Sequence, residues 1–508
     1  MSVRSLVIAA VAFGYLISYP LVIGRADESH LLYGARRVLE GQVIYRDFFE
    51  TITPLAYYLF AGVYRIAGTT LLAARTTIAV IEAFGCVLLF RLVRRVASFP
   101  EAMVATVIFA GICIPTWPYA SWHWISTTLG LLVATVFLDE RWRSSSRARP
   151  LVAGMLAGTG ICLQQQRGVF LAAWLPLAAM VLGSSRPPAA RWRTAWVEIT
   201  AVAVGGAAVV LPILGLAAWA ASPALVFKGI YQFAVQNYGP TQSGRTSWAA
   251  VPLMTQGWVP FTWVWLLRIS PLFLVGEGLL LSFRWRHGRT EQDIERACLW
   301  LLAALMAAAI WYLPDFIHVS FVVPVLLIPG ARLLYELRSR LPVPRAAAAR
   351  WVRATLPCVL VFACTYKAVT NLKRARAAAP VRFQTGFGLL QGDASAEQMF
   401  RTVERHLVRE PTGRALFYSY PDDAWLYLAL PADNATRFSV IVPGFFPDEY
   451  VAEVSADLAA RRPGTVLVAT PFVTKPIQAT IDAGYELAEE FGPYRVYVRR
   501  GSRSPDAP

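Results

Sequence analysis

The chain has 508 residues, of which 56% are hydrophobic and only 16% are charged. A soluble globular protein usually carries about 25% charged residues, so the composition argues against that class. Charged residues cluster between apolar blocks of roughly 17–25 residues, a length that crosses the hydrocarbon core of a membrane. The formal net charge of +16 does not indicate a nucleic-acid-binding protein, because most arginines lie in short clusters beside the apolar blocks.

The first apolar block covers residues 5–23 and follows a single arginine, Arg4. It is long enough to span a membrane and no clear cleavage pattern follows it, so we expect an uncleaved anchor. A long outer loop over residues 24–76 comes next. Its apolar part, 54–67, is short and rich in tyrosine, which predicts a helix lying at the membrane interface. The next spans are expected at residues 77–93, 101–117, 124–138, 151–164 and 168–183.

Further spans are expected at residues 195–220, 263–283, 297–313, 316–335 and 354–370, which makes about eleven in all. A second long outer loop, 221–262, separates the first two of these. With this threading the arginine clusters between spans fall on one side, which the positive-inside rule assigns to the cytoplasm. One cluster does not follow this rule, because Lys373, Arg374 and Arg376 fall on the outer side. Residues 371–380 are expected to form a linker.

The composition changes after residue 380, where charged residues return and the apolar runs shorten to the length of strands. Strands are expected at residues 415–418, 438–442, 465–469 and 494–498, and helices at 396–408, 423–429, 448–460 and 477–483. No glycine-rich phosphate loop follows any of these strands, so nucleotide binding is not indicated there. The sequence thus predicts an α-helical polytopic membrane domain, 1–370, followed by a small extracytoplasmic α/β domain, 381–508.

The densest group of polar residues outside the cytoplasm is the first outer loop. Asp27 and Glu28 follow the first span, where a carboxylate can be partly buried and still reach water. A carboxylate in this position could accept the proton of an attacking hydroxyl or amine, as a general base does. The same residues would also suit the N-terminus of a helix beginning near Ser29. The residues alone leave both interpretations open.

Three arginines lie near the outer ends of predicted spans: Arg75, Arg167 and Arg268. Each could contact a donor phosphate, for which arginine is well suited, or simply extend to the membrane interface. A divalent metal could be held by Asp47, Glu50 and His123 if their loops converge, which spacing cannot establish. Structural hydrogen bonding is the simpler role for His123.

Two stretches of the first outer loop carry a resemblance to a known family: residues 25–28 (Arg-Ala-Asp-Glu) and 45–50 (Tyr-Arg-Asp-Phe-Phe-Glu), with Pro-Leu at 54–55. They resemble the GT-C glycosyltransferases. The nearest likeness is to bacterial relatives of protein O-mannosyltransferases and of the lipid A aminoarabinose transferase, which are glycosyltransferase family 39-like. The stretch 314–318 (Pro-Asp-Phe-Ile-His) also looks like a recurring segment of such proteins.

The resemblance implies a many-helix catalytic domain, an outer C-terminal domain, and a catalytic base at the acidic residue after the first span. Asp27 and Glu28 match that position, and Asp27 is our choice for the base. The aminoarabinose transferases have a Lys-Pro-Pro element after the loop glutamate, whereas Thr-Ile-Thr-Pro follows Glu50 here. Glu50 therefore joins Asp47, His123 and His318 as a candidate for acceptor or metal contact.

The implied function is transfer of a sugar from a polyprenyl-phosphate donor to a glycolipid, polysaccharide or protein acceptor. The reaction would take place at the outer face of a bacterial inner membrane. Nothing marks a covalent nucleophile, so direct displacement with inversion is expected. Two alternatives remain: a flippase for lipid-linked sugars, although the internal repeats frequent in transporters are not found, and a polysaccharide polymerase or ligase.

Overall fold

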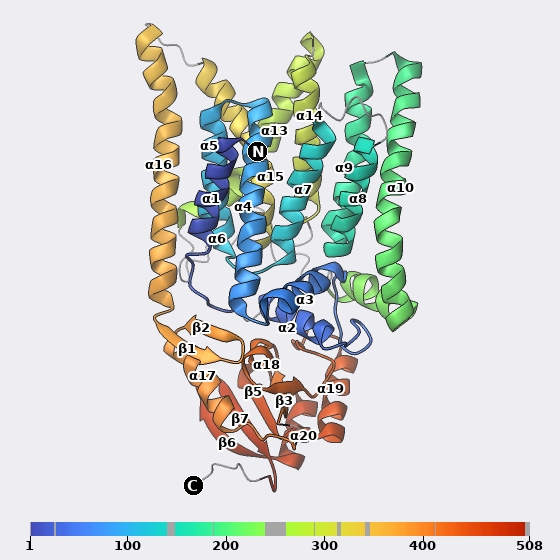
Figure 1. Ribbon diagram of the computed structural model, residues 1–508, viewed down its shortest axis with the longest axis vertical. Helices are drawn as coiled ribbons and strands as arrows, with labels where there is room; N and C mark the ends of the chain where they lie inside the picture. Colours follow the sequence, from blue (N-terminus) through green and yellow to red (C-terminus); the bar gives the residue numbers. More distant parts are fainter. Residues whose placement is uncertain are drawn as a thin grey trace.

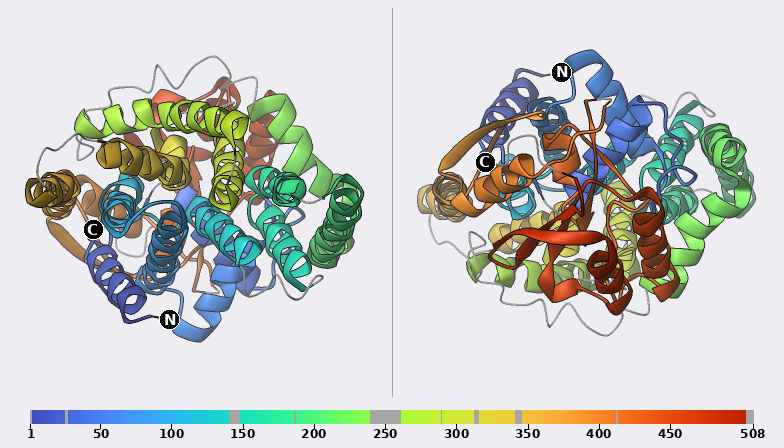
Figure 2. Two further views of the ribbon diagram at one scale, coloured as in Figure 1. Left: turned by 90° about the horizontal axis from the view of Figure 1, so that it is seen from above. Right: turned by 90° about the horizontal axis from the view of Figure 1, so that it is seen from below.

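Long apolar helices that run side by side make up most of residues 3–378. The computed structural model describes residues 2–24, 27–139, 148–185, 187–238, 261–288, 290–311, 316–340, 346–411 and 413–502. Figure 1 shows the upright helical bundle, two helices that lie across its lower end, and a smaller sheet domain below them. Seen from below in Figure 2, the sheet domain covers much of that end of the bundle.

The upright helices of the bundle are α1 (Val3–Leu16), α4 (Leu71–Val96), α5 (Phe99–Ile108), α7 (Trp122–Leu138), α8 (Ala148–Leu163), α9 (Gln165–Leu182), α10 (Pro188–Ala221), α13 (Phe261–His287), α14 (Glu291–Ala308), α15 (Phe316–Arg340) and α16 (Ala346–Ala378). Helix α5 continues through a π-helical turn, η1 (Phe109–Cys113), into α6 (Ile114–Thr116). Each predicted span overlaps one of these helices. Five of them within the described residues, α4, α5 with its continuation, α10, α15 and α16, are long and apolar enough to cross a membrane; the count of about eleven stays a prediction.

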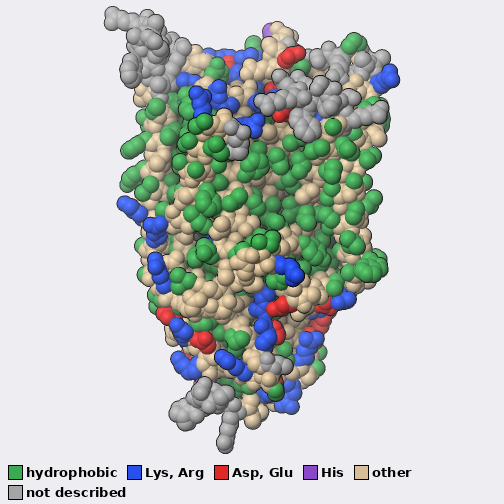
Figure 3. All heavy atoms as spheres, in the orientation of Figure 1, with side chains coloured by type: hydrophobic (Ala, Val, Ile, Leu, Met, Phe, Trp, Pro, Cys, Tyr) green, Lys and Arg blue, Asp and Glu red, His purple; other side chains and the backbone are tan. Residues whose placement is uncertain are grey.

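The outward surface of the bundle is strongly apolar. Figure 3 shows hydrophobic side chains spread over its height, with charged side chains gathered at the upper rim and over the sheet domain. Large side chains such as Trp219 (86% exposed) and Phe362 (75% exposed) point away from the core. A continuous apolar surface of this size would be unfavourable in water. It indicates a membrane protein.

Two predicted boundaries differ from the structure for reasons of backbone chemistry. Helix α1 ends at Leu16 rather than near residue 23, because the ring of Pro20 would clash with the carbonyl four residues before it. Helix α16 runs to Ala378, so most of the linker expected at 371–380 is helical. Residues 371–379 contain neither glycine nor proline, and helix-forming residues continue until Pro380.

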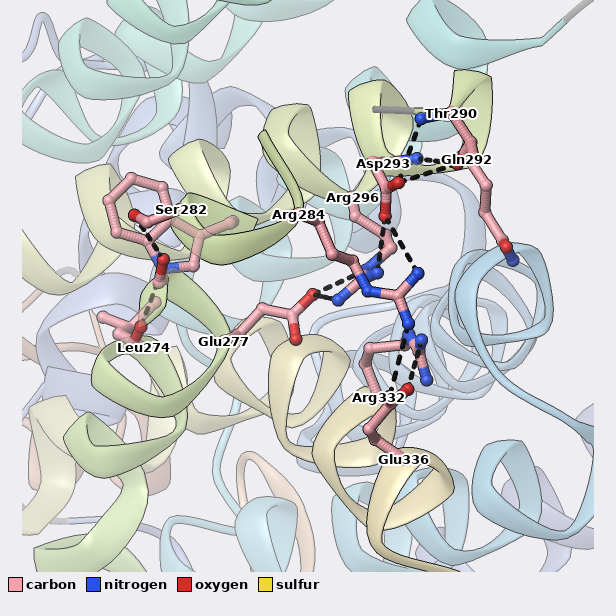
Figure 4. A network of polar contacts seen from close by, with 12 residues as sticks. Leu274, Glu277, Ser282, Arg284, Thr290, Gln292, Asp293, Arg296, Arg332 and Glu336 are labelled. Atoms are coloured by element: carbon pink, nitrogen blue, oxygen red, sulfur yellow. Dashed lines mark hydrogen bonds and ion pairs between the residues drawn. The ribbon is translucent and has the colours of Figure 1, made fainter. Parts of the chain in front are cut away.

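Buried ion pairs join α13, α14 and α15 at the predicted cytoplasmic end (Figure 4). The Arg296 guanidinium pairs with Glu277 at 2.8 Å and with Asp293 at 2.7 Å, and all three side chains are buried. Within α15, Arg332 pairs with Glu336 at 2.6 Å, and Glu336 also pairs with Arg284 of α13 at 3.3 Å. Because a buried charge without a partner is strongly destabilising, these pairs hold the three helices in one register.

Helices α2 (Asp27–Leu39) and α3 (Leu55–Ala67) lie across the end of the bundle, between it and the sheet domain (Figure 1). The helix expected over 54–67 is therefore present and does not run along the bundle. Gly34 of α2 allows the two helices to pack closely, because a Cβ atom there would lie 2.6 Å from the ring of Tyr57. The crosswise pair carries most of the first outer loop to the underside of the bundle.

The predicted C-terminal α/β domain is present. An antiparallel hairpin, β1 (Val381–Thr385) and β2 (Gly388–Gly392), precedes a sheet of order β4-β3-β5-β7-β6. Its strands are β3 (Ala415–Tyr420), β4 (Ala432–Asn434), β5 (Thr465–Ala469), β6 (Tyr485–Phe491) and β7 (Tyr494–Arg499), and its helices are α17 (Ala394–Arg405), α18 (Trp425–Ala429), α19 (Asp448–Arg461) and α20 (Lys475–Gly484). Strand β3 is parallel to β4 and β5, whereas β7 is antiparallel to β5 and β6.

The strands expected at 415–418, 465–469 and 494–498 are confirmed, but residues 438–442 do not form a strand. The side chains of Asn434 and Thr436 donate hydrogen bonds to the Phe438 carbonyl, at 2.8 and 2.9 Å, and hold this apolar stretch as a loop. Strand β6 was not predicted, because three glutamates interrupt its apolar pattern. It lies at the sheet edge, where outward charges are tolerated.

Candidate functional site

The first turn of α2 holds the two acidic residues that follow α1. Asp27 begins the helix and is partly exposed, whereas Glu28 is fully buried. Both carboxylates lie where the positive end of the helix dipole favours negative charge, as the helix-cap interpretation expected. The two side chains nevertheless have different surroundings. Arg25, which belongs to the motif in the sequence, lies outside the described residues.

Glu28 forms a complete set of contacts inside the protein. Its carboxylate accepts hydrogen bonds from the amides of Gly24 and Ala120, each at 2.7 Å, and from Arg75 Nη2 at 2.9 Å, and it lies in ion-pair contact with Arg75 Nε at 2.8 Å. Burial raises the pKa of Glu28, and the Arg75 guanidinium offsets part of that rise. Glu28 therefore fastens the start of α2 to α4 and to the turn before α7.

The Arg75 guanidinium is equally engaged. Besides Glu28 it donates to the backbone carbonyls of Val22 and Pro118, and it lies 5.0 Å from the centre of the Tyr119 ring. Arg75 also lines an open cavity of about 510 Å³ between the ends of α1 and α16, the turn before α7 and the β1–β2 hairpin. In this arrangement its donors are used within the fold rather than aimed at a ligand.

Two acidic residues of the loop, Asp27 and Glu50, both act on one tyrosine, Tyr57. The Tyr57 hydroxyl, fully buried on α3, donates to Glu50 Oε2 at 2.5 Å. Burial raises the pKa of Tyr57 well above its usual range, and the neighbouring carboxylates of Glu50 and Asp27 raise it further. Tyr57 thus contacts Glu50 directly and lies within electrostatic range of Asp27, although the two acidic residues are more than twenty positions apart in the sequence.

Glu50 has the properties of a carboxyl group that is protonated at neutral pH. Glu50 is only partly exposed, and the resulting desolvation raises its pKa to about 8, although the Tyr57 hydrogen bond and the Arg37 guanidinium act in the opposite direction. The ordinary value for a glutamate is near 4.3, so at pH 7 most molecules carry an uncharged Glu50. Tyr57 therefore bonds a neutral carboxyl group and lies within electrostatic range of Asp27.

A polar cluster of three predicted site residues lies on adjoining bundle helices. His123 of α7 shares a 2.8 Å hydrogen bond with Gln164, and its ring stacks on Phe321 with centres 4.5 Å apart. Its ring centre is 5.2 Å from that of His318 on α15. Arg167 of α9 donates to the His123 carbonyl at 3.4 Å. Sequence spacing gave no sign that these residues meet.

The cluster is connected through Gln165, the residue after Gln164, to the loop between α2 and α3 that carries Glu50. The Gln165 amide donates to the Thr51 carbonyl at 2.8 Å and accepts from the Thr53 amide at 3.2 Å. Gln164 and Gln165 are consecutive, so one bonds the histidine cluster and the other bonds the loop. The start of α9 therefore contacts both polar groups.

The predicted metal candidates do not converge. Asp47 points to Arg46, at 2.9 Å, and to the Val43 amide, at 2.7 Å, and these contacts lower its pKa. His123 is engaged with Gln164, and Glu50 with Tyr57. Across the described ranges, no group of three or more His, Cys, Asp or Glu side chains could hold a metal ion.

Two other predictions are only partly described. Arg268 lies in α13, and residues 314 and 315 of the Pro-Asp-Phe-Ile-His stretch lie outside the described residues, as do 239–260 of the second outer loop. The sequence did not single out Tyr57, Gln165 or Gly229 for their roles in the site. Only the run of three glutamines at 164–166, unusual between two apolar blocks, offered a signal.

No protein-family model and no curated protein matches the sequence. Solved structures do match it. The ArnT of Cupriavidus metallidurans bound to undecaprenyl phosphate is 14% identical and aligns over 98% of both chains with a TM-score of 0.63. The apo oligosaccharyltransferase of Archaeoglobus fulgidus is 12% identical and aligns over 99% of this chain and 75% of its own, with a TM-score of 0.56.

A third match is the AglB of Archaeoglobus fulgidus in complex with an inhibitory peptide and a dolichol-phosphate. It is 12% identical, has a TM-score of 0.50, and covers 100% of this chain and 75% of its own. These proteins are GT-C glycosyltransferases, and the likeness extends over nearly the whole chain. The family resemblance seen in the first outer loop is thereby confirmed at the level of fold: the protein has the fold of the GT-C glycosyltransferases.

Proposed function

We propose that the protein transfers a sugar from a polyprenyl-phosphate donor to an acceptor at the outer face of a membrane, with Asp27 as the general base. The observation that carries the proposal is the position of Asp27 in the first turn of α2, the next helix after α1, within electrostatic range of Tyr57, which bonds Glu50. Solved proteins of the same fold bind undecaprenyl phosphate and dolichol-phosphate, which supports a donor of this class.

The proposed reaction is a single displacement. The Asp27 carboxylate accepts the proton of the acceptor hydroxyl or amine as that group attacks the anomeric carbon of the donor sugar. The bond from that carbon to the phosphate oxygen breaks, and the polyprenyl phosphate leaves with the bonding electrons. The configuration at the anomeric carbon inverts. Arg167 and Arg268 are our candidates for contacting the negative charge that develops on the leaving phosphate.

Glu50 supports this chemistry best in its neutral form. A charged carboxylate at this position would add negative charge to the site and would repel the phosphate of the donor. Because its pKa is about 8, Glu50 is mostly uncharged at neutral pH and can donate a hydrogen bond to a sugar hydroxyl. We therefore assign Glu50 to acceptor or donor-sugar contact rather than to a metal.

Glu28 and Arg75 act, in this proposal, by holding the first turn of α2 in place. Both were sequence candidates for direct chemistry, but their polar atoms are occupied by each other and by the backbone. Proton acceptance at Asp27 demands a fixed carboxylate within hydrogen-bonding distance of the acceptor. A buried pair that fastens the neighbouring residue to α4 serves that requirement.

The test is to purify the protein, reconstitute it in vesicles, and follow a labelled polyprenyl-phosphate sugar together with candidate acceptors. We expect release of polyprenyl phosphate coupled to transfer of the label, from donor in the outer-facing leaflet only. Movement of intact donor between leaflets without release would contradict the proposal and favour the flippase. Growth of the labelled glycan by whole blocks would favour the polymerase or ligase.

A further inference from the structure

Phe49, the residue before Glu50, inserts its side chain into the C-terminal domain. Its ring centre lies 5.2 Å from that of Tyr450 on α19, 5.5 Å from Phe438 and 6.0 Å from Phe446. Its backbone amide donates to the Arg437 carbonyl at 3.0 Å. Phe49 is only 9% exposed and belongs to the same apolar core as the sheet residues Val466 and Val468. An aromatic residue of the outer loop is therefore part of the core of another domain.

The second outer loop contributes to the same cluster. Phe233, on the π-helical segment η4 (Lys228–Tyr238), lies 5.3 Å from Phe49 and 5.1 Å from Phe446. Lys228 of this segment lies 4.8 Å from the Tyr450 ring centre. Aromatic pairs at these separations attract each other beyond the effect of burial alone. Phe49 thus joins the first outer loop, the second outer loop and the C-terminal domain.

The segment η4 also touches Glu50 directly. A Cβ atom at Gly229 would lie 2.5 Å from the Glu50 carbonyl oxygen and 3.0 Å from the Tyr45 ring, so only glycine permits this approach. The Tyr45 hydroxyl donates to the Ile52 carbonyl at 2.6 Å and closes the loop around Glu50. Gln165 donates to the carbonyls of Thr51 and Ile230, at 2.8 and 3.1 Å, and ties the two loops together from the bundle side.

We propose that Phe49 is a positioning residue through which the C-terminal domain and the second outer loop hold Glu50 in the site and limit its contact with water. The inference rests on the proposed function for its catalytic meaning, but its structural content is independent of it. It assigns the C-terminal domain the role of steadying the outer loops. The domain supports the residues around Glu50 from the side of the sheet, while Tyr57 of α3 and Gln165 of α9 support them from the side of the bundle.

The pKa of Glu50 should depend on the contacts that Phe49 makes with the C-terminal domain. The titratable and charged groups that face Glu50 are Tyr57 of α3, Arg37 of α2 and Tyr45 of its own loop. Lys228 of η4 is directed toward Tyr450 and Glu449 instead. Burial is the largest cause of the raised pKa of Glu50, so loss of the Phe49 anchor should let water in and lower it.

The test compares Phe49→Ala with Phe491→Ala. Phe491 of β6 is a matched control, since it is 8% exposed and stacks on Tyr494 at the other edge of the sheet. The protonated Glu50 carboxyl is followed by its infrared band as pH is raised, with Glu50→Gln to assign the band. We expect the midpoint, about 8 in the parent protein, to fall in Phe49→Ala and to stay in Phe491→Ala. The fall should be about one pH unit or more.

A second variant tests the same inference without removing a core side chain. Gly229→Ala forces the Glu50 backbone away from η4, whereas Gly215→Ala on α10 places its methyl group in open space. We expect Gly229→Ala to lower the Glu50 midpoint and Gly215→Ala to leave it unchanged. An unchanged Glu50 midpoint in a folded Phe49→Ala protein would overturn the inference. If Phe49→Ala does not fold, an unchanged Glu50 midpoint in Gly229→Ala would overturn it. A shifted midpoint without any sugar transfer by the parent protein would instead refute the proposed function alone.

Discussion

Replacing Tyr57 by phenylalanine tests how the site controls the charge of Glu50. The ring of Tyr57 fills the space beneath Gly34, and Tyr57→Phe keeps that ring. Only the hydroxyl that donates to Glu50 at 2.5 Å is lost. This hydrogen bond favours the carboxylate, so its removal should raise the pKa of Glu50 above its parent value of about 8.

The size of the shift follows from the energy of the bond. A hydrogen bond to a charged group contributes about 1.5–3 kcal/mol. One pKa unit corresponds to about 1.36 kcal/mol, so the titration midpoint of Glu50 should rise by about 1–2 units. If neutral Glu50 is the active form, transfer should fall as pH rises through about 8 in the parent protein, and the variant should remain active to higher pH.

The assay is the pH titration of the Glu50 infrared band, followed by the pH dependence of transfer. Tyr58→Phe is the matched control, because Tyr58 is the next residue on α3, is 45% exposed, and removal of its hydroxyl leaves the Glu50 hydrogen bond intact. A midpoint that stays in place in Tyr57→Phe, or that moves equally in both variants, would refute the assignment of this hydrogen bond.

Two further predictions concern stability. Arg75→Gln leaves the buried Glu28 carboxylate without its ion-pair partner, so the free energy of unfolding should fall by about 3–5 kcal/mol, measured by denaturant titration in detergent; a loss below about 1 kcal/mol would show that the pair does not fasten α2. Gly34→Ala should cost about 1–3 kcal/mol in the same titration, because its new methyl group would overlap a tyrosine ring. Gly62→Ala on α3, where no atom lies within 4 Å, should be nearly neutral, and equal losses in both would contradict the close packing of α2 on α3.

Much of the architecture could be predicted from local patterns. Apolar block length located helices such as α4 and α15, and the change in composition after residue 380 located the C-terminal domain. Observed helix ends differed from the predicted ones where a single residue restricts the backbone, as Pro20 does after the end of α1. The strand β6 escaped detection, because an edge strand with three glutamates lacks the apolar alternation that marks a half-buried strand.

The candidate site was predictable only in part. The position of Asp27 after the first helix is a local feature that the sequence displays directly. The pairing of Glu28 with Arg75, and the meeting of His123 with His318, depend on residues that are far apart in the chain. No periodicity encodes such contacts. The anchoring of Phe49 in the C-terminal domain was unpredictable for the same reason, since an aromatic residue in an outer loop equally suits the membrane interface.

The central claim is that Asp27 accepts the proton of the acceptor, and Asp27→Asn tests it most directly. The amide has nearly the shape of the carboxylate but cannot take a proton at neutral pH. Transfer from a polyprenyl-phosphate sugar by the purified variant should fall by about 10²–10⁴-fold, while binding of the donor is retained. Asp47→Asn, a carboxylate of the same loop that is paired with Arg46, should transfer at the parent rate. Transfer by Asp27→Asn at the parent rate would contradict the claim.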